Sequence, residues 1–310
     1  MSTLRFLIAR LSSAVPTLLC IVTITFFLIR FAPGGPFDQE QALPADVAAN
    51  LNAAYGLDRP IVDQYLRYLH GLLHGDFGPS FRYRDFTVTE LIDQGLPVSF
   101  TLGGIALLIA VIAGVGVGTL AAVGRGGMAD RTVLGLAVLG VAVPSFVLLP
   151  ALGLLFGVEL HWLPVAGWNP GRVDDMVLPV VTLALPPLAY IARLQRGSMS
   201  EALQSPYVRT AFAKGLPLRT VVLRHALRPA LIPVVSYLAP AGAMVMTGSL
   251  VVETIAGLPG IGRYLVQGAL NRDYTLVLGM VIVYSTLLIA LGLVADLLIA
   301  ALDPRVSLEA

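Results

Sequence analysis

Stretches of about twenty mostly apolar residues recur along this chain of 310 residues, and they restrict its fold more than any other feature. A helix needs about 20 such residues to cross a bilayer, whose hydrocarbon core is about 30 Å thick. Hydrophobic residues make up 56% of the chain and charged residues 13%, against about 25% charged in soluble domains. We therefore predict an all-α, polytopic membrane protein.

Six apolar stretches are predicted to be transmembrane helices. The fourth contains three prolines, which a membrane tolerates only inside a bundle or beside a water-filled cavity, so we expect this helix to face the bundle interior. Gly114 and Gly118, on one face of the second stretch, allow another helix to approach closely. The first stretch exceeds the apolar core of a signal peptide and is interpreted as an uncleaved helix. The predicted spans are Leu11–Ile29, Val98–Val123, Val133–Val158, Met176–Ala192, Ala230–Val252 and Leu276–Leu302.

The positions of the basic residues predict that both termini are cytoplasmic. Two arginines precede the first span and two follow the second, and the segment after the fourth span carries seven basic residues against one acidic residue, Glu201. Short loops rich in Lys and Arg lie on the cytoplasmic side of a membrane. These three segments alternate along the chain, so they share one side.

This topology divides the chain into four parts. Residues 1–30 form the cytoplasmic N-terminus and the first transmembrane helix, and residues 31–96 form an extracytoplasmic segment. Residues 97–302 form a core of five helices that includes a cytoplasmic loop at 193–228, and residues 303–310 form a cytoplasmic tail.

Two short helices are predicted in the extracytoplasmic segment, near Pro44–Ala54 and Pro60–Leu73. Asp58 is expected to cap the second, and Pro60 to lie in its first turn. Helical spacing places four residues on one apolar face, so this helix lies on the membrane or packs over the bundle. The four residues are Ile61, Tyr65, Leu69 and Leu72.

Few side chains at membrane depth can carry chemistry. Asp296 lies about two turns from the cytoplasmic end of the sixth span, within reach of water or an arginine, and we favour a structural role for it over a proton relay. The single cysteine, Cys20, permits no intrachain disulfide. His70 and His74 could share one helix face but have no nearby carboxylate, so they are weak evidence for a metal site. We therefore predict no metal site and no catalytic residue. The net charge of +1 gives no basic field for nucleic acid, so no nucleic-acid partner is predicted either.

A compact basic segment follows the fourth span and contains the only lysine, Lys214. Ser205 suits a helix N-cap and Pro206 the first turn, while Gly215 suits the position just beyond a C-terminus. We therefore predict a short helix over 206–214, with a second helix starting at Pro217. Either the short helix is held at the surface by acidic lipid, or it fills a groove on a soluble partner. Its predicted apolar face consists of Tyr207, Val208, Ala211 and Phe212.

Five stretches together resemble the permease subunits of binding-protein-dependent ABC importers. Within these they are similar to the peptide group, and specifically to the B subunits of oligopeptide permeases. The resemblance covers nearly the whole chain and is specific because the motifs occur together. The stretches are SPYVRTAFAKGLPLRTVVLRHALRPALIPV, RFAPGGPF, GLDRPIVDQYLRYLHGLLHGDFGPSF, VVETIAGLPGIGRYLVQGALNRDYTLVLG and the closing DPR.

The resemblance implies the type I ABC importer permease fold and two functional segments. Aligning Gly215 with the invariant glycine of the family's coupling loop puts Arg209, Thr210 and Ala211 at its Glu-Ala-Ala positions, so any role of that glutamate is in doubt here. The implied ATPase-coupling helix is Pro206, Tyr207, Val208, Arg209, Thr210, Ala211, Phe212, Ala213, Lys214 and Gly215, supported by Arg224, His225, Leu227 and Arg228. The implied outer gate loop contains Glu253, Gly257, Pro259, Gly260 and Gly262.

The chain contains no phosphate-binding G-x-x-x-x-G-K-[ST] motif. We therefore expect it not to be an enzyme and to bind no cofactor itself, with ATP and Mg on partner subunits. The resemblance implies import of oligopeptides through a bacterial inner membrane. The implied partners are a second homologous permease, two ATP-binding subunits, an extracytoplasmic peptide-binding protein and membrane lipid. A secondary transporter driven by an ion gradient is the alternative. Such transporters typically have inverted repeats and intramembrane carboxylates, and we find no convincing internal repeat in this sequence. A further alternative is an ABC permease for a non-peptide solute such as nickel or a glycan. No substrate-binding residue is predicted.

Overall fold

The chain folds into a bundle of helices. The computed structural model describes residues 3–32, 35, 45–83, 85–128, 130–132, 135, 140 and 142–302, and these residues form no strand, only one isolated bridge between Pro79 and Thr87. Among them, five helices are long and apolar enough to cross a membrane, which confirms an all-α polytopic protein. Pro44, part of RFAPGGPF and the tail 303–310 lie outside the described residues. The five helices are α1 (Thr3–Phe31), α4 (Val88–Val123), α7 (Asp174–Gln204), α12 (Leu238–Ala256) and α14 (Tyr274–Leu302).

The third predicted span, Val133–Val158, is not one continuous helix. Part of it lies outside the described residues, and the described part is interrupted at Pro144, which has no backbone N–H to donate. Helix resumes as α6 (Ser145–Leu152) and the π-helix η1 (Gly153–Glu159).

Other helices also differ in extent from the predicted spans. The second helix starts at Val88, ten residues before its predicted start, because Thr87 and the Glu90 side chain form a capping box there. The fourth helix continues past Ala192 to Gln204, since most residues of 193–204 (Arg, Leu, Gln, Met, Glu and Ala) are good helix formers. The predicted fifth span, Ala230–Val252, is broken into α10 (Leu227–Ala230), α11 (Ile232–Ser236) and α12, because Pro229 and Pro233 interrupt the backbone hydrogen bonds.

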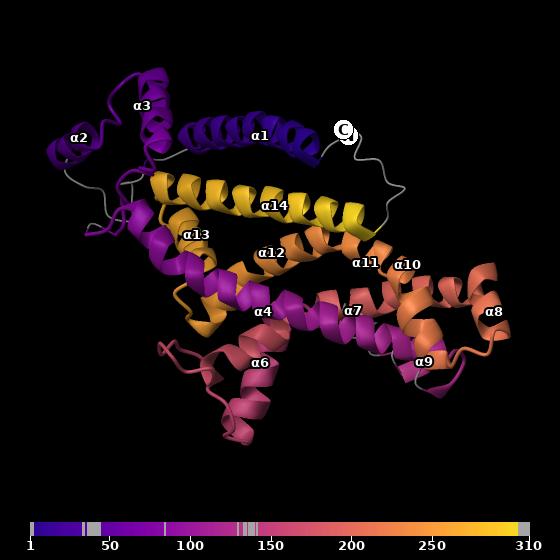
Figure 1. The fold of residues 1–310 in the computed structure, drawn as a ribbon. Helices are drawn as coiled ribbons and strands as arrows, with labels where there is room; N and C mark the ends of the chain where they lie inside the picture. The colour runs from indigo at the N-terminus through magenta and orange to yellow at the C-terminus, as the bar shows by residue number, and fades with distance from the viewer. Residues whose placement is uncertain are drawn as a thin grey trace.

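Helices α4 and α7 pack closely against each other at the centre of the bundle (Figure 1). A Cβ atom added at Gly118 would lie 2.5 Å from the Ala192 carbonyl oxygen, and one at Gly114 would lie 2.8 Å from Ile191 Cγ2. The two glycines therefore permit the contact, as predicted. The prolines Pro179 and Pro187 of α7 are buried, which confirms that this helix faces the interior.

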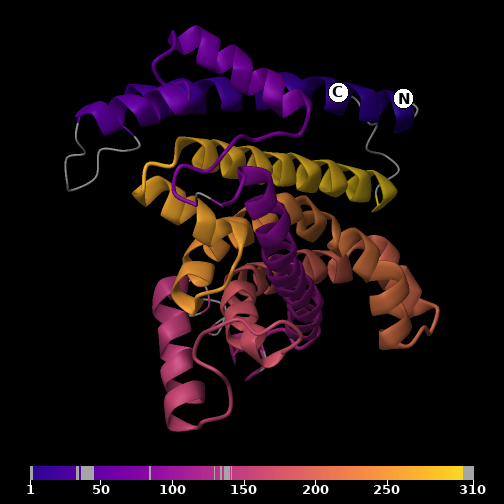
Figure 2. The same ribbon diagram turned by 90° about the vertical axis from the view of Figure 1, so that its left-hand side faces the viewer.

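Helix α14 lies between α1 and the rest of the bundle in both views (Figures 1 and 2). The two helices are joined by an ion pair, in which Arg10 Nη2 lies 2.6 Å from Asp296 Oδ2. Asp296 thus has an arginine partner, which satisfies its charge within the protein.

The segment between α1 and α4, predicted to be extracytoplasmic, contains α2 (Ala45–Ala54) and α3 (Ile61–Leu73), close to the two predicted helices. The apolar face of α3 packs on α1: the Tyr65 hydroxyl lies 2.6 Å from Thr23 Oγ1, and its ring centroid lies 5.3 Å from that of Phe26. Asp58 does not cap α3, because Pro60 occupies the N-cap position and no side chain caps the helix.

Asp273 attaches the segment between α3 and α4 to the start of α14. Its buried carboxylate accepts hydrogen bonds from Ser80 Oγ (2.5 Å) and from the backbone N–H groups of Phe81 (3.0 Å) and Arg82 (3.1 Å). Its other oxygen accepts the N–H of Leu276 (3.2 Å) in the first turn of α14. One side chain therefore caps a transmembrane helix and holds the outer segment.

Candidate functional site

The predicted coupling helix is present as α8 (Pro206–Ala213). Lys214 occupies the C-cap and Gly215 has φ +77, a left-handed conformation that favours glycine. Ser205 stands at the N-cap with extended backbone angles, but its hydroxyl donates back to the Ala202 carbonyl oxygen (2.6 Å). The prediction that Ser205 caps α8 with its side chain was therefore wrong, although the position was right.

The apolar face of α8 is divided between two environments. Val208 and Ala211 are buried, whereas Tyr207 and Phe212 are 49% and 42% exposed. The buried pair contributes to a core cluster with Met199 of α7 and other small apolar residues. The buried pair thus anchors α8 to the bundle while the aromatic pair remains exposed, an arrangement suited to entering a groove on another protein.

The core cluster under α8 connects it to the transmembrane helices. Besides Val208, Ala211 and Met199, it contains Ala122, Ala202, Val221, Val222, Ala226 and Ala230. These residues come from α4, α7, α8, the π-helix η2 (Val221–Ala226) and α10. A displacement of α8 would therefore act on both central helices, because close-packed cores transmit strain.

The predicted supporting residues lie on η2 and α10, after α9 (Leu218–Thr220). Leu227 packs against the core cluster, and Arg228 Nη2 donates to the Ala301 carbonyl oxygen of α14 (3.3 Å). Arg224 is exposed and His225 is half-buried. The structure therefore attaches Leu227 and Arg228 to the bundle more firmly than the other two.

An ion pair near α8 was missed by the sequence reasoning. Arg196 of α7 donates through Nε and Nη2 to the Asp130 carboxylate, with Nη2 at 2.8 Å, and the Gly126 N–H donates to the same carboxylate at 2.9 Å. The hydrogen bond from Arg196, followed by that from Gly126, lowers the pKa of Asp130 to about 2. The pair fixes the loop after α4 to α7.

The predicted outer gate loop lies at the opposite end of the bundle from α8 (Figure 1). Gly257 ends α12 with φ +69, and the chain then passes through Pro259 and Gly260 into α13 (Ile261–Leu270). Glu253 is fully buried, so it belongs to the last turns of α12 rather than to an exposed loop. The structure thus brings the predicted outer residues together but keeps them far from the coupling helix.

The Glu253 carboxylate holds the outer loop against α4. It accepts hydrogen bonds from Ser99 Oγ of α4 (2.6 Å) and from the backbone N–H of Gly262 (2.8 Å). Ser99 Oγ in turn accepts the N–H of Ile261 (2.9 Å). A Cβ atom added at Gly260 would lie 2.2 Å from Glu253 Oε2, so only glycine fits above the carboxylate. Ser99, which the sequence did not single out, is therefore part of this network.

Comparison with known proteins assigns a family to this arrangement. Residues 114–308 match the family described as "Binding-protein-dependent transport system inner membrane component". Residues 3–102 match its N-terminal part, "Binding-prot-dependent transport system membrane comp, N-term". The chain belongs to this family.

Curated relatives match over nearly the full length of both chains. The oligopeptide transport system permease protein OppB of Escherichia coli (strain K12) is 51% identical over 303 residues, 98% of this chain and 99% of the relative. OppB of Haemophilus influenzae is 48% identical over the same shares. The dipeptide transport system permease protein DppB of Bacillus subtilis is 42% identical over 98% of each chain. The resemblance to peptide permeases is thereby confirmed.

Proposed function

We propose that this chain is a transmembrane subunit of an ATP-driven importer that moves oligopeptides through a bacterial inner membrane. The names of its relatives, which are oligopeptide and dipeptide permeases, support the cargo. The observation that carries the mechanism is the division of α8, whose Val208 is buried while Tyr207 and Phe212 are exposed. Permeases are not enzymes, so ATP and Mg bind to separate subunits.

Coupling begins when an ATP-binding subunit holds the exposed face of α8, from Pro206 to Gly215. Motion of that subunit displaces α8, and the core cluster beneath it passes the displacement to α7 and α4. At the outer end, α4 carries Ser99, which is bound to Glu253 and Ile261. Helix α4 therefore contacts both the core cluster under α8 and the outer loop from Glu253 to Gly262, so a displacement of α8 reaches that loop through α4.

The remaining parts of the importer follow from this role. A second homologous permease completes the passage, two ATP-binding subunits drive it, and an extracytoplasmic binding protein delivers the peptide. Both termini lie in the cytoplasm, and residues 31–96 face outward with 97–302 as the permease core.

The test compares two phenylalanines of equal exposure. Phe212 and Phe86 are each 42% exposed, but Phe86 precedes α4 at the outer end. We expect Phe212→Ala to lower ATP-dependent uptake of a labelled tripeptide into proteoliposomes about tenfold or more, the loss typical of a buried aromatic anchor. Phe86→Ala serves as the matched control and leaves uptake unchanged.

Two measurements accompany uptake. The ATP-binding subunit is expected to co-purify with the unsubstituted chain in mild detergent and to dissociate more readily from Phe212→Ala. Equal uptake by the two variants would contradict the role of α8. Uptake driven by a proton gradient without ATP would instead establish the secondary-transporter alternative.

A further inference from the structure

A cavity of about 560 Å³ opens at the extracytoplasmic end of the chain, between the ends of α1 and α14 and the two short helices α2 and α3. Its volume falls within the range of small-molecule sites, about 300–1,000 Å³. Its polar lining consists of Arg30, Asn52, Asp58, Gln64 and Tyr274. These groups belong neither to the coupling helix nor to the outer gate loop.

Arg30 presents an unused donor at this cavity. Its guanidinium carbon lies 5.3 Å from the ring centroid of Phe26 and 5.1 Å from that of Tyr274, so the two rings restrict its position. Its Nε is buried and has no hydrogen-bond partner, and no ion pair joins Arg30 to a carboxylate among the described residues. A buried guanidinium N–H without a partner is rare, and a carboxylate is the acceptor that fits it best.

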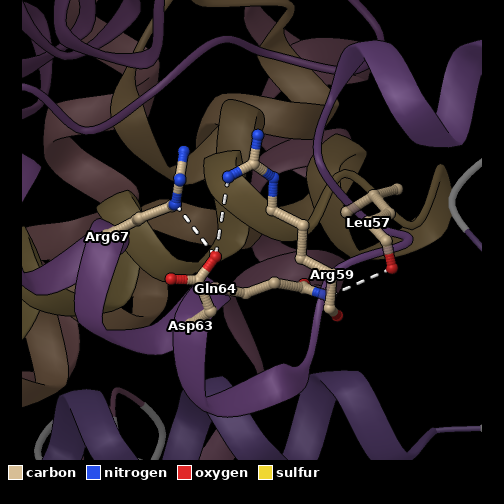
Figure 3. Close-up of polar contacts among 5 residues, drawn as sticks. All are labelled: Leu57, Arg59, Asp63, Gln64 and Arg67. Atoms are coloured by element: carbon tan, nitrogen blue, oxygen red, sulfur yellow. Dashed lines mark hydrogen bonds and ion pairs between the residues drawn. The ribbon is translucent and has the colours of Figure 1, made fainter.

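Gln64 presents an unused acceptor. Its Nε2 donates to the backbone carbonyl oxygens of Leu57 (3.0 Å) and Arg59 (2.8 Å), both in the loop before α3 (Figure 3). Because both neighbours are acceptors, the amide nitrogen must face them, and the orientation of the group is determined. Its Oε1 is buried and has no partner, so its capacity to accept an N–H is unused.

Asp58 supplies a negative charge to the same cavity. The adjacent Arg59 pairs with Asp63 instead, with its Nη1 3.6 Å from Asp63 Oδ2 (Figure 3). The same oxygen accepts a hydrogen bond from Arg67 Nε. No ion pair of Asp58 is found among the described residues. The cavity thus combines a cation, an anion and an amide-like acceptor.

We propose that this outer cavity binds a short peptide in its zwitterionic form. The terminal carboxylate of the peptide pairs with Arg30, a peptide N–H donates to Gln64 Oε1, and the terminal ammonium faces Asp58. The inference rests on the proposed function, since it gives imported peptide a first contact on the permease itself.

The experiment measures protection of a cysteine in the cavity by trialanine. Asn52→Cys is introduced together with Cys20→Ser, and the full chain is purified with the subunits that accompany it and placed in nanodiscs without the binding protein. Alkylation by a membrane-impermeant maleimide is timed with and without peptide at up to about 10 mM, a range that covers weak sites. We expect trialanine to slow alkylation.

Peptide and protein variants then assign the contacts. Trialaninamide, which lacks the carboxylate, and N-acetyl-trialanine, which lacks the ammonium, are each expected to need about tenfold more peptide for equal protection, the loss of one charge-assisted hydrogen bond. Arg30→Gln is expected to remove the preference for the free carboxylate, and Asp58→Asn the preference for the free ammonium. Asp93→Asn, an exposed carboxylate outside the cavity, is the matched control and keeps both preferences.

Three results would overturn the proposal. They are alkylation that trialanine does not slow, equal protection by all three peptides, and loss of both preferences in the control. If Arg30→Gln fails to assemble, the comparison of peptides on the unsubstituted chain still decides the question. Uptake is measured in the same preparation after the binding protein is added. Intact uptake without protection refutes the cavity site alone, whereas absent ATP-dependent uptake refutes the proposed function.

Discussion

Replacing Gly260 with alanine should damage the outer loop through one collision. The backbone at Gly260 has φ −95 and ψ 166, which any residue adopts, so the substitution introduces no backbone strain. The new Cβ would lie 2.2 Å from Glu253 Oε2 and 2.6 Å from Ser99 Oγ, so the carboxylate must move. It would then lose its hydrogen bonds to Ser99 and Gly262.

The magnitude follows from these two hydrogen bonds. A buried polar group left without its partner costs about 1–3 kcal/mol, so two cost about 2–6 kcal/mol. Gly257→Ala is the matched control, because its Cβ would meet nothing within 4 Å and only its φ of +69 opposes the change. That strain costs about 1–2 kcal/mol. We therefore expect Gly260→Ala to be the more destabilising variant.

Thermal unfolding of the purified chain in detergent measures the difference, and ATP-dependent uptake measures its effect on function. The apparent melting temperature should fall further for Gly260→Ala than for Gly257→Ala. Adding Glu253→Ala to Gly260→Ala removes the obstacle, so the double variant should lose less than the sum of the single losses. Equal melting of the two glycine variants, or strict additivity in the double variant, would show that Glu253 is not what excludes a side chain at Gly260.

Three other substitutions test contacts elsewhere in the bundle. The pKa of Asp130 is lowered to about 2, so its ion pair should add stability above about pH 4, the ordinary carboxyl value, and lose it as the pH falls toward 2. Asp130→Asn should flatten acid unfolding curves over that window, and unchanged curves would contradict this role. Asp273→Ala removes the acceptor of one buried and two part-buried N–H groups and should cost about 3–5 kcal/mol, exposing the segment before α4 to protease. An unchanged digestion pattern would refute the role of Asp273 in holding that segment. Gly118→Val places a Cβ 2.5 Å from the α7 backbone and should prevent folding. Gly116→Val is the control, because a Cβ at Gly116 meets nothing within 4 Å. Expression of the two variants at equal levels would refute close packing of α4 and α7.

Most of the helical architecture could be predicted from local patterns. Long apolar runs indicated the spanning helices, and the prolines of α7 indicated its buried position. The left-handed residue Gly215 and the start at Pro206 located α8 within one residue of its observed end. These features depend on residues close together in the chain, where propensity, capping and hydropathy act directly.

The polar contacts between helices could not be predicted in the same way. Ser99 and Glu253 are 154 residues apart, and Ser80 and Asp273 are 193 apart. No local pattern specifies such pairs, because their meeting depends on how whole helices pack. The extent of α7 was missed for another reason: hydropathy marks only the apolar part of a helix, and α7 continues past this part to Gln204.

The pairing of α1 with α14 has a consequence for biogenesis. Helix α1 is synthesised well before α14, yet α14 lies between α1 and the central helices α4 and α7. The ion pair between Arg10 and Asp296 can therefore form only after α14 has been inserted. A chain shortened before α14 would lack both this ion pair and the surface on which α1 packs, so α1 should depend on α14 for its docking.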